Sequence, residues 1–287
     1  MRTQAIGAGF EGLEERLLLA GSVTSALVAG VLVLDGDGLA NQVQLTVASN
    51  GQLTATGLSG TTINGVTSFN FGVVSTPLVV NGGAGDDTIS LNSTAAAFAN
   101  NVTIDGGIDN DTITATGRFG ANLVIDGGTG LDTISVSKAT VAVNLDLDAG
   151  DGNDKVTLSD STVARDALIQ TGLDNDTVTI KGMAVNRNLS LADTGGTNLF
   201  TITNSSTRND TLVVLGDGTD TLIVNGLTAG VKTGASAQGL ISIDFGDGKN
   251  VLLMSKTKAL GTIPLVANPF VTPLVITGDG IVLIGGT

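Results

Sequence analysis

The chain has 287 residues, with 27 acidic and 13 basic side chains and a formal net charge of −14, and it contains no Cys, His, Trp or Tyr. The missing residue types exclude thiol and imidazole catalysis, disulfide bonds and zinc sites of the Cys/His kind. The acidic balance disfavours nucleic acid as a partner and favours cations. A mean hydropathy of +0.35 disfavours intrinsic disorder.

Residues 1–30 differ in composition from the rest of the chain, because all three Glu residues lie there whereas every Asp follows from Asp35 onward. The segment F-E-G-L-E-E-R-L-L-L-A (10–20) resembles the LEPR-XLL motif at the N-termini of secreted and surface proteins of planctomycete bacteria, with Glu15 where that motif has Pro. An amphipathic helix start is the alternative interpretation. The resemblance implies an export segment at 1–30, outside the folded domain. No run of 18 apolar residues predicts a membrane span.

Residues 31–38 (V-L-V-L-D-G-D-G) predict an irregular first coil of a repeat, and residues 49–76 predict one coil without a Gly-Asp turn. At the other end, residues 273–284 predict a last coil near three prolines that interrupt exposed strand edges. One domain at 31–287 is expected, with Gly-Asp turn repeats at about 82–250.

Between these flanks one pattern recurs with a period of about 22 residues: an apolar stretch, a Gly-rich turn, an Asp or Asn, and a second apolar stretch. The Asp or Asn positions are Asp87, Asp111, Asp132, Asp154, Asp176, Asn198, Asp220 and Asn250. Apolar residues alternate within each unit, which is the period of a β-strand. Two positions after the Asp or Asn the apolar row begins Ile89, Ile113 and Ile134.

A 22-residue unit with two or three short strands buries its inner side chains only when units stack. The sequence therefore predicts an all-β fold, a parallel β-solenoid (β-helix or β-roll) with about 22 residues per coil. An Asn or Asp row before the first strand of each unit, including Asn122, Asn144 and Asp166, predicts a stacked corner that bonds the next coil's backbone.

The turns supply the candidate site. Gly82, Gly83, Gly85, Asp87 and Ile89 match the nonapeptide G-G-x-G-x-D-x-U-x at every defined place. This resembles the RTX, or haemolysin-type, calcium-binding repeat. The resemblance implies Ca²⁺ held by glycine carbonyls and carboxylates of stacked turns. The implied ligands are Gly82, Gly83, Gly85, Asp87, Asp105, Gly107, Asp109, Asp111, Asp126, Gly128, Gly130, Asp132, Asp148, Gly150, Gly152, Asp154, Asp174, Asp176, Asp217 and Asp220.

Each 22-residue unit has one Gly-rich turn, whereas the RTX coil has two, so a single row of sites is expected. Stacking also places carboxylates about 5 Å apart, where they repel by roughly 3 kcal/mol per pair. Such a row needs a counterion, protonation or displacement into solvent. The alternative is that Gly and Asp are there only because they form turns readily.

Two surface patterns suggest other functions. Outward Thr pairs such as Thr112/Thr114 and Thr177/Thr179 resemble the T-x-T rows of ice-binding solenoids, although Lys155 interrupts them. A predicted basic stripe of Arg165, Arg187 and Arg208 could meet an anionic polysaccharide, as in β-helical polysaccharide lyases. No Tyr or His is present as a general base.

The expected function is therefore an exported, non-enzymatic, calcium-binding solenoid that acts as a structural or adhesive module, extracellular or at the cell surface. Its expected partners are calcium ions together with surface polysaccharide or other surface proteins, without nucleic acid. The alternative is a secreted β-helix enzyme that acts on polysaccharide.

Overall fold

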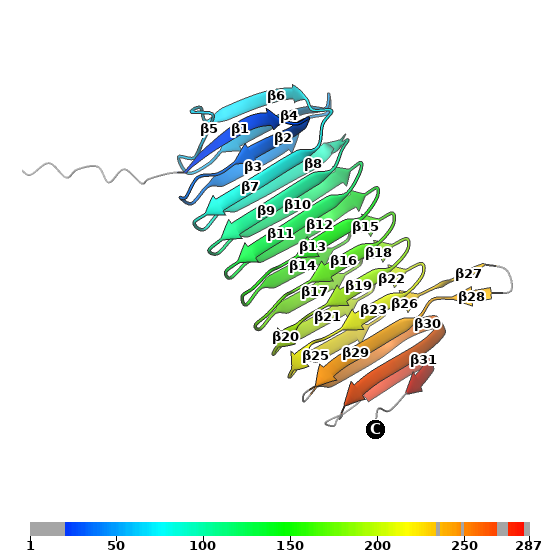
Figure 1. Cartoon of the computed structure of the whole chain (residues 1–287). Coiled ribbons are helices and arrows are strands. Elements are labelled where there is room, and N and C mark those ends of the chain that lie inside the picture. Colours follow the sequence, from blue (N-terminus) through cyan, green and yellow to red (C-terminus); the bar gives the residue numbers. More distant parts are fainter. Residues whose placement is uncertain (1–20, 234–235, 248–249, 269–274, 284–287) are drawn as a thin grey trace, which may run out of the picture.

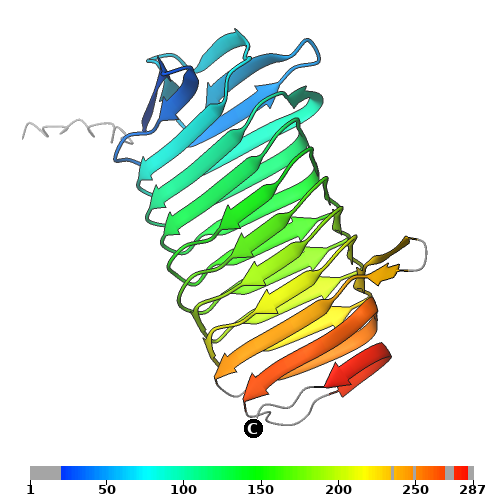
Figure 2. The same ribbon diagram turned by 45° about the vertical axis from the view of Figure 1, so that its right-hand side comes forward.

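The computed structural model describes residues 21–233, 236–247, 250–268 and 275–283, and these residues form strands and turns with no helix (Figures 1 and 2). The strands stack into a rod with about seven turns of roughly 22 residues each. Nearly all pairings between coils are parallel. The predicted parallel β-solenoid and its period are confirmed.

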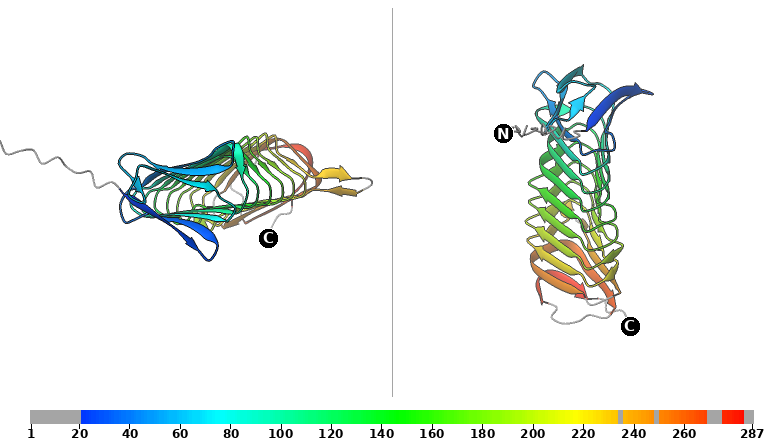
Figure 3. Two further views of the ribbon diagram at one scale, coloured as in Figure 1. Left: turned by 90° about the horizontal axis from the view of Figure 1, so that it is seen from above. Right: turned by 90° about the vertical axis from the view of Figure 1, so that its left-hand side faces the viewer.

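Each coil contributes one strand to each of two long facing sheets, which the end-on view separates clearly (Figure 3). Sheet 1 consists of β8 (Thr88–Phe98), β10 (Thr112–Phe119), β12 (Thr133–Val141), β14 (Lys155–Ser159), β17 (Thr177–Lys181), β21 (Leu199–Thr203), β25 (Thr221–Asn225) and β30 (Val251–Asn268), with β31 (Val275–Leu283) beside β30. Sheet 2 consists of β2 (Val31–Asp35), β7 (Leu78–Ala84), β9 (Val102–Ile108), β11 (Leu123–Thr129), β13 (Leu145–Asp148), β16 (Ala167–Gln170), β19 (Leu189–Ala192), β23 (Thr211–Val214) and β29 (Ile241–Asp247).

The two sheets meet along two opposite edges of the rod. At one edge run the Gly-Asp turns, where β20 (Gly195–Gly196) pairs with β24 (Asp217–Gly218). The opposite, short-strand edge contains β15 (Thr162–Val163), β18 (Ala184–Val185), β22 (Ser206–Thr207) and β26 (Thr228–Ala229) (Figure 1). Each coil thus passes through sheet 2, a Gly-Asp turn, sheet 1 and the short-strand edge.

The core lies between the sheets and is a set of apolar columns, because equivalent residues of successive coils pair in register. Ile89, Ile113 and Ile134 align on β8, β10 and β12 and are at most 1% exposed. The matching column on sheet 2 includes Ile104 and Ile125. Each such side chain contributes about 1.5–3 kcal/mol when fully buried. The predicted inward rows are confirmed.

The N-terminal end differs from the prediction of one further coil at 49–76. Strands β3 (Gln42–Val47), β4 (Gln52–Gly57) and β6 (Ser68–Val73) form an antiparallel meander, and β5 (Thr62–Ile63) is a short strand beside β1 (Ser22–Val28). The dipeptide Asn50-Gly51, with Gly51 at φ 81°, closes the β3–β4 turn. That hairpin signal outweighs the repeat here, and the meander caps the core.

Strand β1 (Ser22–Val28) also belongs to this N-terminal cap, although it lies within the segment assigned to export. It pairs antiparallel with β2 through a two-residue turn at Ala29 and Gly30, both at positive φ. The folded domain therefore begins by residue 22, not 31. The LEPR-XLL-like segment at 10–20 lies outside the described residues.

The longest step of the repeat, from Asp220 to Asn250, contains an insertion. Strands β27 (Val231–Thr233) and β28 (Ser236–Gln238) form an antiparallel hairpin that projects from the short-strand edge (Figure 1). The stacking of β23 on β29 and of β25 on β30 continues past it in register. The insertion therefore leaves both long sheets intact.

Candidate functional site

The Asp and Asn residues that define the period form a continuous hydrogen-bonded ladder inside the turn edge. In each coil the backbone N–H of the ladder residue donates to the side-chain Oδ1 of the ladder residue in the next coil. The eight bonds, from Asn41 to Asn250, join Asn41–Asp87, Asp87–Asp111, Asp111–Asp132, Asp132–Asp154, Asp154–Asp176, Asp176–Asn198, Asn198–Asp220 and Asp220–Asn250, at 2.6–3.0 Å. We call this the inner ladder.

The carboxylates of the inner ladder point into the protein and not into solvent. The six aspartates Asp87, Asp111, Asp132, Asp154, Asp176 and Asp220 are 0–2% exposed. In all six the second oxygen, Oδ2, is buried without a hydrogen-bond partner. Displacement into solvent is therefore excluded as the way in which this row relieves its repulsion, which leaves protonation or a counterion.

The Asn members of the ladder reveal what surrounds the unpartnered oxygens. The Nδ2 of Asn41 donates to the carbonyl oxygen of Leu39 at 2.7 Å, and that of Asn250 donates to Phe245 at 3.1 Å. The equivalent group of Asn198 donates to Oδ2 of Asp193 at 2.9 Å. At each Asn coil this position holds a donor that faces an acceptor. In the Asp coils the carboxylate oxygen Oδ2 takes the place of that NH2 group. Because an oxygen cannot donate, Oδ2 needs a proton or a cation to face the same acceptors.

The same carboxylates explain the first glycine of three turns, which stands five positions before the ladder Asp. A Cβ on Gly82, Gly106 or Gly127 would lie 2.5–2.9 Å from Oδ2 of the Asp of its own coil. It would also lie 2.2–2.4 Å from a carbonyl oxygen of the next coil. Both oxygens border the space that the absent side chain leaves. The predicted turn glycines thus make room for a buried carboxylate, beyond their value as turn formers.

Burial dominates the electrostatics of the inner ladder. Loss of hydration raises the pKa of Asp87, Asp132 and Asp220 to about 6. It raises the pKa of Asp111, Asp154 and Asp176 to about 7, with additional repulsion from neighbouring carboxylates. Hydrogen bonds from backbone N–H groups oppose both effects. A ladder without cations is therefore partly protonated at neutral pH.

The structure also buries a carboxylate, Asp193, that is not among the residues predicted from the sequence. Asp193 is 5% exposed and stands five positions before Asn198, the inward place that Gly82, Gly106 and Gly127 occupy in their coils. Thr171, one coil earlier, donates from its hydroxyl to Oδ1 of Asp193 at 3.1 Å, and Gly216 donates from its backbone N–H to Oδ2 at 3.2 Å. Alignment of the repeat at the first-glycine column would have shown Asp193.

The remaining predicted acidic ligands lie on the outer surface of the rod and are separate from the inner ladder. Asp105, Asp126 and Asp148 stand side by side on the outer face of sheet 2. Burial, together with repulsion from Asp105 and Asp148, raises the pKa of Asp126. Exposed Asp109 and Asp174 replace the third glycine, and both adopt positive φ (79° and 78°).

Of the predicted glycines only Gly82 is buried, and those at the second and third places of the turn are partly or fully exposed. Gly83, Gly107, Gly128 and Gly150 adopt positive φ and stack their backbones, so a Cβ on Gly107 would meet Gly83. The third-place glycines Gly85, Gly130 and Gly152 follow at positive φ. Exposed Asp217 lies at the same edge in a later coil, where it pairs with Gly195. The fold thus brings the inner ladder together and separates it from the outer acids. Within the described residues no group of three or more acidic side chains is arranged around one point.

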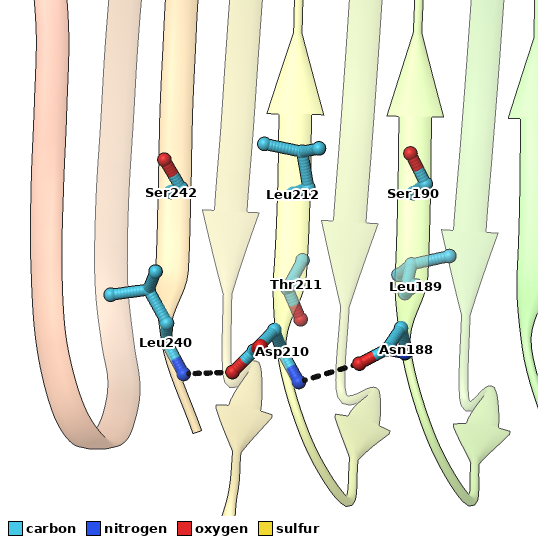
Figure 4. A pocket seen from close by; sticks show the side chains of 8 residues that line it. All are labelled: Asn188, Leu189, Ser190, Asp210, Thr211, Leu212, Leu240 and Ser242. Atoms are coloured by element: carbon cyan, nitrogen blue, oxygen red, sulfur yellow. Dashed lines mark hydrogen bonds between the residues drawn. The ribbon is translucent and has the colours of Figure 1, made fainter. Parts of the chain in front are cut away.

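The predicted corner ladder is present at the short-strand edge. Asp210 donates from its backbone N–H to Oδ1 of Asn188 at 3.3 Å, and Leu240 donates to Oδ1 of Asp210 at 2.8 Å (Figure 4). The same bond links Asn144 to Asn122 at 3.1 Å. Here the N–H belongs to the later coil, so the bonds run opposite to those of the inner ladder.

The predicted arginine stripe is only partly correct. Arg165 and Arg187 are in register, because the N–H of Arg187 donates to the carbonyl of Arg165, but Arg208 pairs one column away, with Val185. The step of 21 residues between Arg187 and Arg208 causes this shift. Arg187 forms an exposed ion pair with Asp166 at 3.3 Å.

The inner ladder offers oxygens of the kind that Ca²⁺ prefers, namely carboxylates and carbonyls. Six buried oxygens without partners lie in one column, and carbonyl oxygens border the first glycines beside them. No protein-family model, curated protein or solved structure matches the chain. Among the described residues no helix is long and apolar enough to cross a membrane.

Proposed function

We propose that the protein is an exported, non-enzymatic β-solenoid that serves as a structural or adhesive module at the cell surface, and that calcium neutralises its inner ladder. One observation carries the calcium part: six buried Oδ2 atoms have no partner, in positions where Asn coils place a hydrogen-bond donor. Asp87, Asp111, Asp132, Asp154, Asp176 and Asp220 would supply the carboxylates, and turn carbonyls the remaining oxygens.

The proposed location fits the chemistry of weak calcium sites. Modular extracellular proteins bind Ca²⁺ with Kd values of about 10⁻⁴ to 10⁻³ M, which match extracellular calcium concentrations. A site occupied at several times its Kd adds about 1 kcal/mol to the free energy of unfolding. A column of such sites adds a contribution in every coil. The resemblance of residues 10–20 to an export motif supports the same location.

Thermal unfolding in excess chelator and in millimolar calcium tests the calcium part. We expect a large rise in Tm with Ca²⁺ and a much smaller rise with Mg²⁺, which demands stricter octahedral geometry. Asp132→Asn should reduce the calcium-dependent rise while it raises Tm in chelator, because the amide supplies the missing donor. Asp146→Asn is the matched control, because it removes the same charge from an exposed position on sheet 2. Equal melting of the wild-type protein in chelator and calcium would show that calcium does not neutralise the ladder.

Fractionation tests the location. We expect the protein in the extracellular or cell-surface fraction. A stable cytosolic protein that retains residues 1–20 would contradict export.

A further inference from the structure

Charge is divided between the two sides of the rod. All seven Lys and Arg residues between positions 90 and 225 lie on sheet 1 or on the short-strand edge. Arg118, Lys138, Lys155 and Lys181 are exposed on sheet 1 or in the bend that follows its strands. The net charge of −14 conceals this basic side.

The other side of the rod is acidic. Between β9 and β24, sheet 2 and the Gly-Asp turns carry no basic residue, and their outer positions carry eight aspartates from Asp105 to Asp217. The outward positions of sheet 1 from β8 to β25 carry no acidic residue. On the short-strand edge the charges are mixed: Arg165, Arg187 and Arg208 are exposed, but so are Asp160 and Asp210, and partly exposed Asp166 forms an ion pair with Arg187. The basic excess of this side therefore lies on sheet 1. An anionic partner is therefore attracted to one side and repelled by the other.

Sheet 1 also presents hydroxyl groups in straight columns along the rod. The middle column reads Ser90, Thr114, Ser135, Thr157, Thr179 and Thr201, in register from β8 to β21. All six are partly exposed, and none of their hydroxyls forms a hydrogen bond with another described residue. Neighbouring hydroxyls are separated by the strand spacing of about 4.8 Å. The column is thus an extended row of free donors and acceptors.

We propose that sheet 1 docks a linear acidic polysaccharide that lies along the rod axis. This inference rests on the proposed adhesive function and names its partner. The polymer's hydroxyls bond the Ser and Thr columns, and its carboxylates or sulfates lie near the basic residues. Nucleic acid fits less well, since the outward positions of sheet 1 from β8 to β25 carry no aromatic ring for base stacking.

The test measures retention of the full chain on immobilised polygalacturonate, with dextran as the neutral polymer, in millimolar calcium. We expect retention on polygalacturonate that falls as ionic strength rises. Lys155→Thr/Lys181→Thr should weaken binding about three- to tenfold. The control Thr103→Glu/Ser190→Glu changes the net charge by the same amount on sheet 2 and should leave binding within about twofold of wild type.

A second variant, Thr157→Val/Thr179→Val/Thr201→Val, removes hydroxyls without changing charge and keeps residues that favour strands. It should weaken retention while circular dichroism shows an unchanged fold. The proposal is overturned by equal loss in the sheet 1 and sheet 2 charge variants, by stronger retention on dextran or single-stranded DNA, or by thermal hysteresis of ice without polysaccharide binding.

Failure of this inference is distinguishable from failure of the proposed function. The polysaccharide is recovered and its chain length measured: cleavage by the wild-type protein would contradict the non-enzymatic proposal but leave the docking face in place. Calcium-independent melting with intact retention would contradict the calcium ladder alone.

Discussion

The coil around Asn198 and the coils around Asp87 to Asp176 solve the same packing problem in different ways. In the Asp coils a glycine or another uncharged residue faces the ladder, and a carboxylate oxygen is left without a partner. In the coil around Asn198 the buried carboxylate is that of Asp193, outside the ladder. The ladder residue is an amide, and its Nδ2 donates to Oδ2 of Asp193 at 2.9 Å. The comparison shows that the ladder side chain ends in a hydrogen-bond donor where a carboxylate oxygen faces it, and in an oxygen without a partner where none does.

The largest expected effect is on the calcium-free protein as pH changes. Because burial raises the pKa values of the six ladder aspartates to about 6–7, the folded state favours their protonated form. Their stabilising contribution is complete below about pH 4 and is lost as pH rises through 6–7, at about 3–4 kcal/mol per carboxylate. Urea unfolding in chelator from pH 4 to 8 measures this slope. Calcium should flatten it, and a stability that rises with pH in chelator would refute the assignment.

The next effect separates the roles of the two carboxylate oxygens of Asp132, since Oδ1 accepts a hydrogen bond and Oδ2 has no partner. Asp132→Ala removes the acceptor for the N–H of Asp111, which is buried, so the free energy of unfolding should fall by about 2–4 kcal/mol. Asp132→Asn keeps that acceptor and should not destabilise the protein in chelator. Asp146→Ala, at an exposed position on sheet 2, should change the free energy of unfolding by less than about 0.5 kcal/mol. Equal losses for the Ala and Asn variants would mean that the ladder aspartates must be charged.

Asn198→Asp places a ladder carboxylate in the one coil that already buries Asp193. The new carboxylate would face Oδ2 of Asp193, so we expect a loss of about 3 kcal/mol at pH 7 in chelator, which acid restores. Adding Asp193→Leu, the residue found at position 215, should recover part of the loss. A double-mutant cycle gives the coupling, and additive effects would show that the two side chains are independent.

The smallest effect belongs to the corner ladder at the short-strand edge. Asn144→Ala removes the acceptor for the N–H of Asp166, which is only partly buried, so water can replace the amide. We expect a loss of about 0.5–1 kcal/mol in thermal unfolding. A loss as large as that of Asp132→Ala would mean that both ladders contribute equally, whatever their burial.

The fold could be predicted because a solenoid repeats one local rule. The period of about 22 residues and the alternation of Ile and Thr fix the inward columns and the stacking. The N-terminal cap could not be predicted this way, since Asn50-Gly51 starts a hairpin within a stretch that has the same composition as the coils. The repeat pattern contains no information about where it stops.

The candidate site was predicted in part. The period identified every member of the inner ladder from Asp87 to Asn250, but alternation of side chains applies only within strands and says nothing of the direction in which a turn residue points. Ladder aspartates and outer aspartates such as Asp105 were therefore treated alike. Asp193 was overlooked because Asp is expected near a turn, and only its inward column makes it unusual.

Each coil in the inner ladder donates one hydrogen bond and accepts one, always in the same direction, and the corner ladder does the reverse. Duplication or loss of a whole coil therefore leaves no bond unmade, whereas a partial insertion breaks both ladders unless it falls between their residues. The hairpin β27–β28 does so: Asp220 still bonds Asn250 at 2.7 Å and Leu240 still bonds Asp210 at 2.8 Å. The unit by which this protein can lengthen is thus the coil, and the short-strand edge is the place where new sequence can be added without altering the rod.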